Sequence, residues 1–158
     1  MFSIGDKVVY PMHGAGIIEA IEEREVLGET KQYYIMRLPL GELKVMIPLM
    51  NVKSIGLRYV IDEAGVDEVF SILQEKDDEM STNWNRRYRA NLERIKSGDV
   101  FEVAAVVRNL VLREKEKGLS TGERKMLDNA RQILLSELVL AKGMEEETAN
   151  LLLEEYIG

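Results

Sequence analysis

One short stretch of the chain combines side-chain types that are suited to binding nucleic acid. In residues 82–89, the only tryptophan of the protein, Trp84, is followed by Arg86, Arg87 and Arg89. Guanidinium groups neutralise phosphate, while a flat apolar ring stacks on bases or wedges between them. The chain as a whole is acidic, with a formal net charge of -7, so composition alone does not explain a basic cluster. This stretch is therefore a candidate contact for nucleic acid.

A second interpretation places Trp84 in a hydrophobic core. Tyr88, Leu92 and Ile95 follow it at helical spacing, so Trp84 can open the apolar stripe of an amphipathic helix. A large aromatic side chain on such a stripe is usually buried. Sequence physics by itself favours this second interpretation.

Charge is strongly segregated around the stretch. Residues 81–96 carry five cations and one glutamate, a net charge of +4, whereas residues 62–80 carry eight acidic side chains and one lysine, a net charge of -7. Because an acidic body repels phosphate, contact with DNA would be confined to a patch and supported by a second contact. Arg124 and Lys125 add cations near a predicted helix start, where backbone N–H groups favour phosphate.

No catalytic or cofactor motif emerges. His13 is the single histidine and the chain has no cysteine, so a zinc site would depend on carboxylates. Residues 14–16 could begin a dinucleotide fingerprint, but Glu19 occupies the third glycine position and a strand is predicted to follow. The acidic residues 77–79 are interpreted as a solvated loop. The protein is predicted not to be an enzyme and to use no cofactor, metal or small-molecule substrate.

Composition indicates a soluble cytoplasmic protein. No apolar run reaches the roughly 18 residues that span a bilayer, and the first residues lack a basic segment followed by an apolar one. The absence of cysteine fits a reducing compartment.

The first 55 or so residues have the pattern of a small β module. Gly14 and Gly16 are predicted to bracket one turn, residues 28–29 to break the next run and residues 39–41 to form another turn. Strands are predicted at residues 7–10, 17–22, 32–38 and 43–47. Short strands joined by tight turns suggest an SH3- or Tudor-like barrel.

From about Asp62 the apolar period changes to that of helices. Ser120 with Glu123, and less clearly Asp99 with Glu102, resemble capping boxes at helix starts. Apolar positions that share helical faces lie within residues 66–73, 84–95, 103–111, 127–141 and 145–156. The predicted fold is α+β, with a β module in residues 1–55 followed by an all-α domain of about five helices in residues 56–158.

Three blocks, in residues 5–16, 83–92 and 118–127, together resemble the CarD/CdnL family of bacterial transcription regulators. The β module of this family is shared with the polymerase-interacting domain of the transcription-repair coupling factor. The resemblance implies that residues 1–55 bind the β subunit of bacterial RNA polymerase. It implies that the helical domain contacts promoter DNA at the upstream edge of the opened −10 region, where the tryptophan acts as a wedge that stabilises the open complex.

The resemblance revises the interpretation of Trp84. In the first turn of its helix it can project off the end of the stripe, while Tyr88, Leu92 and Ile95 stay in the core. DNA binding by such a patch is weak and not sequence-specific, and tethering to polymerase at the nucleoid raises its effective concentration. The implied DNA-binding residues are Trp84, Arg86, Arg87, Arg89, Arg124 and Lys125.

The resemblance also implies a polymerase contact through an exposed strand edge. Met46 departs from the arginine that family members often carry at this position. The alternative interpretation of Val45 and Ile47 is that their side chains are plain barrel core. The implied polymerase-binding residues are Arg24, Lys44, Val45, Met46, Ile47 and Pro48.

An alternative function is a protein–protein adaptor, whose barrel binds polymerase while the helical domain binds another protein. Acidic surfaces at residues 62–80 and 145–147 would suit basic partners. In that case Trp84 would be core, and its loss would unfold the domain.

Overall fold

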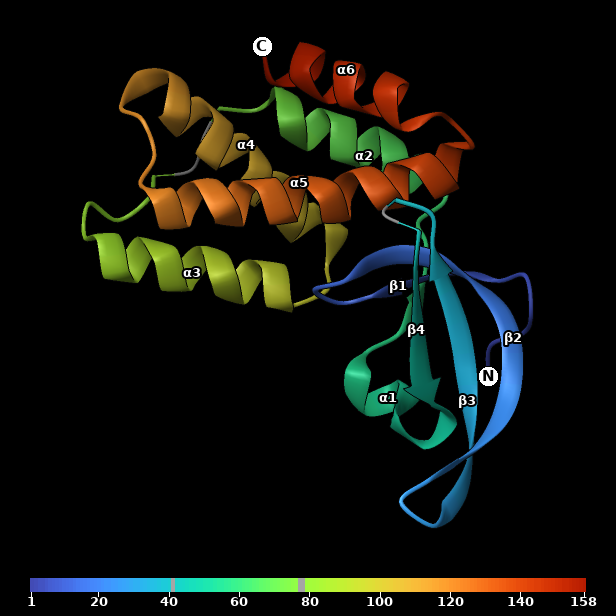
Figure 1. Cartoon of the computed structure of the whole chain (residues 1–158). Coiled ribbons are helices and arrows are strands. Elements are labelled where there is room, and N and C mark those ends of the chain that lie inside the picture. Colours follow the sequence, from blue (N-terminus) through green and yellow to red (C-terminus); the bar gives the residue numbers. More distant parts are fainter. Residues whose placement is uncertain (41, 77–78) are drawn as a thin grey trace.

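The computed structural model describes residues 1–40, 42–76 and 79–158. Figure 1 shows a small β module that carries the N-terminus and a layered group of helices beside it. The predicted α+β fold, with a β module before a helical domain, is confirmed. Gly41, part of the predicted third turn, and Asp77 and Asp78, part of the predicted acidic loop, lie outside the described residues.

The β module is a five-stranded antiparallel sheet in the order β4-β3-β2-β1-β5. Its strands are β1 (Lys7–Tyr10), β2 (Gly14–Val26), β3 (Glu29–Leu38), β4 (Leu43–Pro48) and β5 (Arg58–Tyr59). A 3-10 turn (Leu49–Asn51) and the short helix α1 (Val52–Ile55) follow β4 and return the chain to β1, with which β5 pairs. This meander with a returning last strand is the SH3- or Tudor-like arrangement that the sequence predicts.

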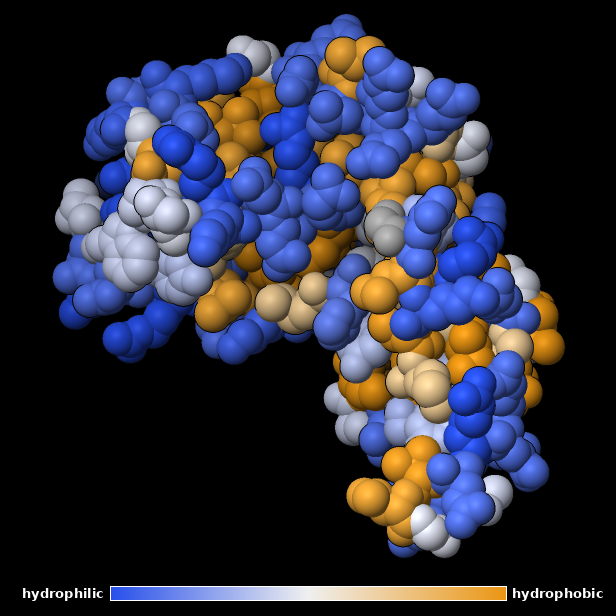
Figure 2. All heavy atoms as spheres, in the orientation of Figure 1, coloured by the Kyte–Doolittle hydropathy of each residue, from blue (hydrophilic) through white to orange (hydrophobic). Residues whose placement is uncertain are grey.

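A long hairpin of β2 and β3 extends away from the helices (Figure 1). Val26 pairs with Glu29 across the two-residue turn of Leu27 and Gly28, and both turn residues have positive φ angles, 51° and 79°. Such a turn matches the right-handed twist of the flanking strands. Figure 2 shows apolar residues at this tip, where Leu27 is almost fully exposed.

The predicted turn around Gly14 and Gly16 is wrong, because both residues lie inside β2. The chain turns earlier, before residue 14, at Pro11–His13. The two glycines instead permit close approach. A β-carbon on Gly16 would clash with the carbonyl oxygen of Arg37. A β-carbon on Gly14 would lie 2.8 Å from the Ser136 hydroxyl, on a helix of the second domain.

Within the described residues, five long helices follow the β module, in line with the predicted number. They are α2 (Glu63–Gln74), α3 (Trp84–Lys96), α4 (Val100–Glu116), α5 (Thr121–Lys142) and α6 (Glu146–Ile157). The side chains of Asp62, Asn83, Asp99 and Ser120 accept hydrogen bonds from backbone N–H groups at the starts of α2 to α5. The capping box predicted at Asp99 and Glu102 is incomplete, because the Glu102 carboxylate accepts a hydrogen bond from the Arg94 side chain, at 2.6 Å, instead.

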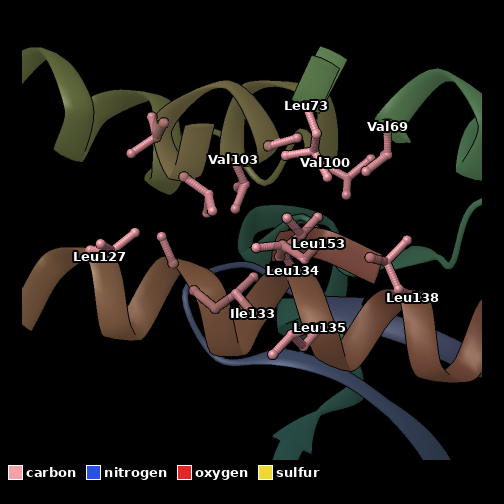
Figure 3. Packing of buried hydrophobic residues seen from close by; sticks show 14 of the residues in the cluster. Val69, Leu73, Val100, Val103, Leu127, Ile133, Leu134, Leu135, Leu138 and Leu153 are labelled. Carbon is pink, nitrogen blue, oxygen red and sulfur yellow. The ribbon is translucent and has the colours of Figure 1, made fainter. Parts of the chain in front are cut away.

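The helical core lies where α2, α4, α5 and α6 meet (Figure 3). Leu134 and Leu138 of α5 point toward Val69 and Leu73 of α2, with Leu153 of α6 beside them. A separate cluster around Ile18, Tyr34 and Met36 fills the β module. None of the described helices is long and apolar enough to cross a membrane.

Polar contacts from α5 hold the two domains together. The Ser136 hydroxyl accepts a hydrogen bond from the backbone N–H of Ala15 at 2.8 Å. The Glu137 carboxylate accepts two bonds from the Arg58 guanidinium, at 2.8 and 2.7 Å, and one from the backbone N–H of Ile61 at 3.0 Å. We call the Arg58–Glu137 pair with the Ser136 bond the interdomain clamp. Because Glu137 is buried, the clamp restrains the angle between sheet and helices. The domain boundary at residues 55 and 56 stays a prediction, with β5 lying just beyond it.

Candidate nucleic-acid interface

The helix that carries the basic aromatic stretch begins at Trp84. The Asn83 side chain accepts a hydrogen bond from the backbone N–H of Arg86 at 3.1 Å and so caps the helix. Ile95, at the other end of the stripe, is buried, while Tyr88 and Leu92 are half-buried. Trp84 keeps 41% of its surface exposed. Its place in the first turn therefore leaves the indole at the edge of the core.

The Trp84 indole contacts residues of both α3 and α5. Its ring stacks on Tyr88 with a centroid distance of 4.9 Å and an interplanar angle of 18°. Its Nε1–H donates a hydrogen bond to the Ser120 hydroxyl at 2.9 Å. A β-carbon at Gly122 would be 3.4 Å from the indole Cζ2 atom. One face of the ring is thus covered by α3 and the start of α5, and the rest faces outward.

The structure separates Arg87 from its basic neighbours. Arg87 is only 4% exposed, and its guanidinium donates to both carboxylate oxygens of Glu123, at 2.8 and 3.2 Å. It also donates to the backbone carbonyl of Ser81 at 3.1 Å. The buried guanidinium joins α3 to α5 beneath Trp84, and it is not presented to solvent as a phosphate contact.

Arg87 and Glu123 are both in their charged forms. The hydrogen bond from Arg87 holds the pKa of the Glu123 carboxyl below its usual range, against the opposing effect of burial. The same hydrogen bond raises the pKa of Arg87. The charges therefore satisfy each other inside the domain and add little to the outward potential.

The remaining cations of the stretch are on the surface. Arg86, Arg89 and Lys125 are exposed and form no ion pair within the described part of the chain. Arg124 lies 3.3 Å from Glu114, with both side chains well exposed. Exposed pairs of this kind contribute little stability, so phosphate can compete for Arg124.

Two helix starts bring these cations to one end of the domain. Figure 1 shows the N-terminal ends of α3 and α5 at the end of the helical domain that is farthest from the sheet. The bond between Trp84 and Ser120 joins the two starts. Helix N-termini carry partial positive charge, which adds to the field of Arg86, Arg89, Arg124 and Lys125. The result is a basic surface with a half-exposed aromatic ring.

The implied polymerase edge is the outer strand β4 of the sheet. Lys44 and Met46 project outward, the latter with 44% of its surface exposed, whereas Ile47 is fully buried in the barrel core. Val45 and Pro48 are half-buried. The side chain of Ile47 is therefore unavailable, and only its backbone could face a partner.

Arg24 lies on the exposed hairpin and not beside β4. In the strand register Glu22 lies opposite Tyr33, which pairs with the last residue of β4, Pro48. Arg24 is thus beyond the end of β4, and it bonds Glu22 at 3.0 Å. A partner that touched both places would follow the hairpin past the sheet edge.

Sequence reasoning missed the partners of Trp84 and of Arg87. Ser120 and Glu123 carried a signal only as a helix cap, and Tyr88 only as a core residue. The Ser120 hydroxyl does accept from the backbone N–H of Glu123 at 3.2 Å. Its second role, toward an indole 36 positions earlier, has no local signal.

Comparisons with known proteins cover both domains. Residues 2–61 match the family model of the CarD-like/TRCF RID domain, and residues 68–154 match that of the CarD C-terminal domain. The chain is 46% identical over 147 residues to the Bacillus subtilis (strain 168) protein named "Putative transcription factor YdeB", which covers 93% of this chain and 96% of that protein. The solution NMR structure of the 72-residue N-terminal domain of Myxococcus xanthus CarD is 36% identical, with a TM-score of 0.33, over 37% of this chain and 79% of that one.

Proposed function

The chain belongs to the CarD family of transcription factors, and on this premise we propose that it bridges RNA polymerase and promoter DNA. The sheet binds the β subunit of a bacterial RNA polymerase. The end of the helical domain that carries Trp84 contacts DNA at the upstream edge of the opened −10 region. There the indole hinders reclosing of the bubble, so the open complex lasts longer.

The observation that carries this proposal is the setting of Trp84. A large aromatic ring at the edge of the helical core keeps 41% of its surface exposed. Arg86 and Arg89 on the same helix, and Lys125 near the start of α5, add exposed cations at this end of a protein whose net charge is -7. Phosphate contacts from such cations would position a ring that wedges at a base step.

The energetics favour a wedge that acts only on distorted DNA. Separating stacked bases costs a few kcal/mol per step, and the exposed cations supply too few phosphate contacts to repay this on intact duplex. At a bubble edge the stacking is already lost. The ring then gains contact without that cost and opposes the return of the paired state.

Tethering supplies the affinity that the patch lacks. Phosphate contacts position a protein but do not specify sequence. A second contact to polymerase converts DNA binding into an intramolecular event with a high effective concentration. We therefore propose that the polymerase, and not the DNA sequence, directs this protein to promoters in the cytoplasm.

The polymerase contact proposed here is a backbone one, with side chains at its margin. The free edge of β4 offers unpaired N–H and C=O groups for an added strand. Lys44 and Met46 present side chains to the partner, and Arg24 can pair with an acidic group beyond the end of β4. Ile47, which is buried, contributes by fixing the strand.

The test is the lifetime of promoter open complexes after a heparin challenge, with and without this protein. We expect Trp84→Ala to shorten the lifetime at least about tenfold relative to the wild-type complex, because the wedge opposes stacking energies of a few kcal/mol. Leu151→Ala is the matched control. Leu151 is an exposed apolar residue on α6, away from the basic surface, and its loss should leave the lifetime unchanged.

Polymerase binding is measured on the same variants by pull-down. If the wild-type protein binds polymerase but does not lengthen the lifetime, or if Trp84→Ala binds polymerase and lengthens the lifetime as much as the wild type, the wedge proposal fails. The sheet would then act in an adaptor, with the helical domain serving a protein partner.

A further inference from the structure

The Ser120 hydroxyl is the meeting point of three hydrogen bonds. It accepts one from the indole Nε1–H of Trp84 at 2.9 Å and one from the backbone N–H of Glu123 at 3.2 Å. It donates its own proton to the Glu123 carboxylate at 3.2 Å. A hydroxyl has one donor and two acceptor sites, so every site on Ser120 is used.

We propose that Ser120 is a positioning residue that holds the Trp84 indole in its wedge orientation. This inference rests on the proposed function, because it concerns the residue that contacts DNA. Ser120 acts through Trp84 and need not touch DNA itself. A helix cap is a structural role, but the bond to an indole on another helix is an additional one.

The surroundings of Ser120 fix its own orientation. The Glu123 carboxylate that receives its proton is buried and is held by the two bonds from Arg87. With its proton directed to Glu123, the hydroxyl has its lone pairs free for the two N–H donors. The chain of contacts therefore runs from the buried ion pair through Ser120 to the indole.

The indole has few ways to leave this position. Tyr88 covers one face at a centroid distance of 4.9 Å, and α5 at Gly122 lies close enough that a β-carbon there would be in contact with the ring, 3.4 Å from its Cζ2 atom. The hydrogen bond at the Nε1 edge then selects one orientation of the stacked ring. A free surface tryptophan would rotate about two side-chain torsions.

Fixing the ring before DNA arrives removes part of the cost of binding. Immobilising a side chain at an interface costs about 0.5–1.5 kcal/mol, which corresponds to about two- to tenfold in an equilibrium constant. We expect this range for the loss in open-complex lifetime when the Ser120 bond alone is removed. The loss is smaller than that expected for removal of the whole ring.

A double-mutant cycle tests the inference, using Trp84→Phe and Ser120→Ala. Phenylalanine keeps a flat apolar ring and the Ser120 cap but has no N–H donor. Each single change is expected to shorten the open-complex lifetime about two- to tenfold, and Ser120→Ala is expected to add little in the Trp84→Phe background. Ser120→Thr retains a hydroxyl and should restore the wild-type lifetime. Additive effects of the two changes would overturn the inference.

The indole proton supplies a readout that is independent of transcription. Because the chain has one tryptophan, its 15N–1H correlation spectrum shows a single indole cross-peak. We expect this peak to shift and to exchange faster with water in Ser120→Ala but not in Ser120→Thr. Thermal unfolding of each variant shows whether the domain stays folded. An unchanged peak in folded Ser120→Ala would overturn the inference.

The two proposals fail in different ways. If the wild-type protein does not lengthen open-complex lifetimes, the wedge function fails, whatever the NMR spectra show. If Trp84→Ala shortens the lifetime while the cycle is additive and the indole peak is insensitive to Ser120, the wedge stands and positioning by Ser120 is wrong.

Discussion

Replacing Arg87 with methionine separates a structural cation from a DNA-binding one. The resemblance to the family places Arg87 in the DNA-binding segment, whereas the structure buries it against Glu123. Methionine keeps an unbranched apolar side chain of similar reach but no charge. The change therefore leaves the Glu123 carboxylate, only 1% exposed, without its partner.

The cost follows from that unpaired carboxylate. Removing one member of a buried ion pair destabilises a protein by about 3–5 kcal/mol. For a chain of this length each kcal/mol shifts the melting temperature by about 2–4 °C. We expect Arg87→Met to lower the melting temperature by about 6–20 °C, measured by circular dichroism. Converting Glu123 to methionine as well should recover most of the loss.

Arg86→Met is the matched control, because Arg86 is the neighbouring residue and is exposed. It should change the free energy of unfolding by no more than about 0.5 kcal/mol, as surface changes do, and the melting temperature by no more than about 1–2 °C. It should instead weaken binding of a labelled promoter fork and reduce the salt slope by about one phosphate contact. Arg87→Met, measured well below its melting temperature, should keep the wild-type salt slope.

The reverse pattern would refute this reasoning. If Arg87→Met melted like the wild type and lost the same salt slope as Arg86→Met, Arg87 would be a phosphate ligand in solution. The buried pair would then not describe the functional state of the interface.

Three further predictions concern acid stability, domain geometry and polymerase affinity. The lowered pKa of Glu123 means that its stabilising contribution is complete above the ordinary glutamate pKa of about 4.3 and is lost as pH falls through the lower folded value. Urea unfolding between pH 7 and pH 3 should show a smaller acid-side loss of stability in Glu123→Gln, and equal losses in both proteins would contradict the assignment. Arg58→Ala leaves the buried Glu137 carboxylate without the guanidinium that donates two hydrogen bonds to it. X-ray scattering should then show a wider range of domain orientations, and the open-complex lifetime should fall although polymerase binding is retained. Lys53→Ala, which changes an exposed residue of α1, is the control. Met46→Arg changes a side chain that is 44% exposed on the β4 edge, so we expect unchanged melting and tighter binding to the polymerase β subunit by biolayer interferometry, and weaker binding would argue against a β4 contact.

Local pattern was sufficient for most elements of the fold. β1 covers the residues predicted for it, and the predicted caps Asp99 and Ser120 stand at the starts of α4 and α5. These signals are readable because caps and periodicity act between residues a few positions apart.

The glycines of the first turn show where local pattern misleads. Glycine is favoured in turns, yet Gly14 and Gly16 lie within β2. There the carbonyl of Arg37 comes too close for a β-carbon on Gly16, and the Ser136 hydroxyl comes close to Gly14 in the same way. These neighbours come from a different strand and a different domain. Their positions depend on the packing of the whole chain, so the sequence around the glycines contains no record of them.

The candidate site divides in the same way. The sequence by itself determined that an aromatic ring and a cluster of cations occupy one helix start, because residue type and helical spacing are local properties. Only the tertiary structure decided which of them face solvent. It buried Arg87 on Glu123 and set Trp84 on Ser120, both across 36 positions of sequence. The physical reason is that exposure and ion pairing depend on what packs against a side chain, and here that neighbour is the start of α5.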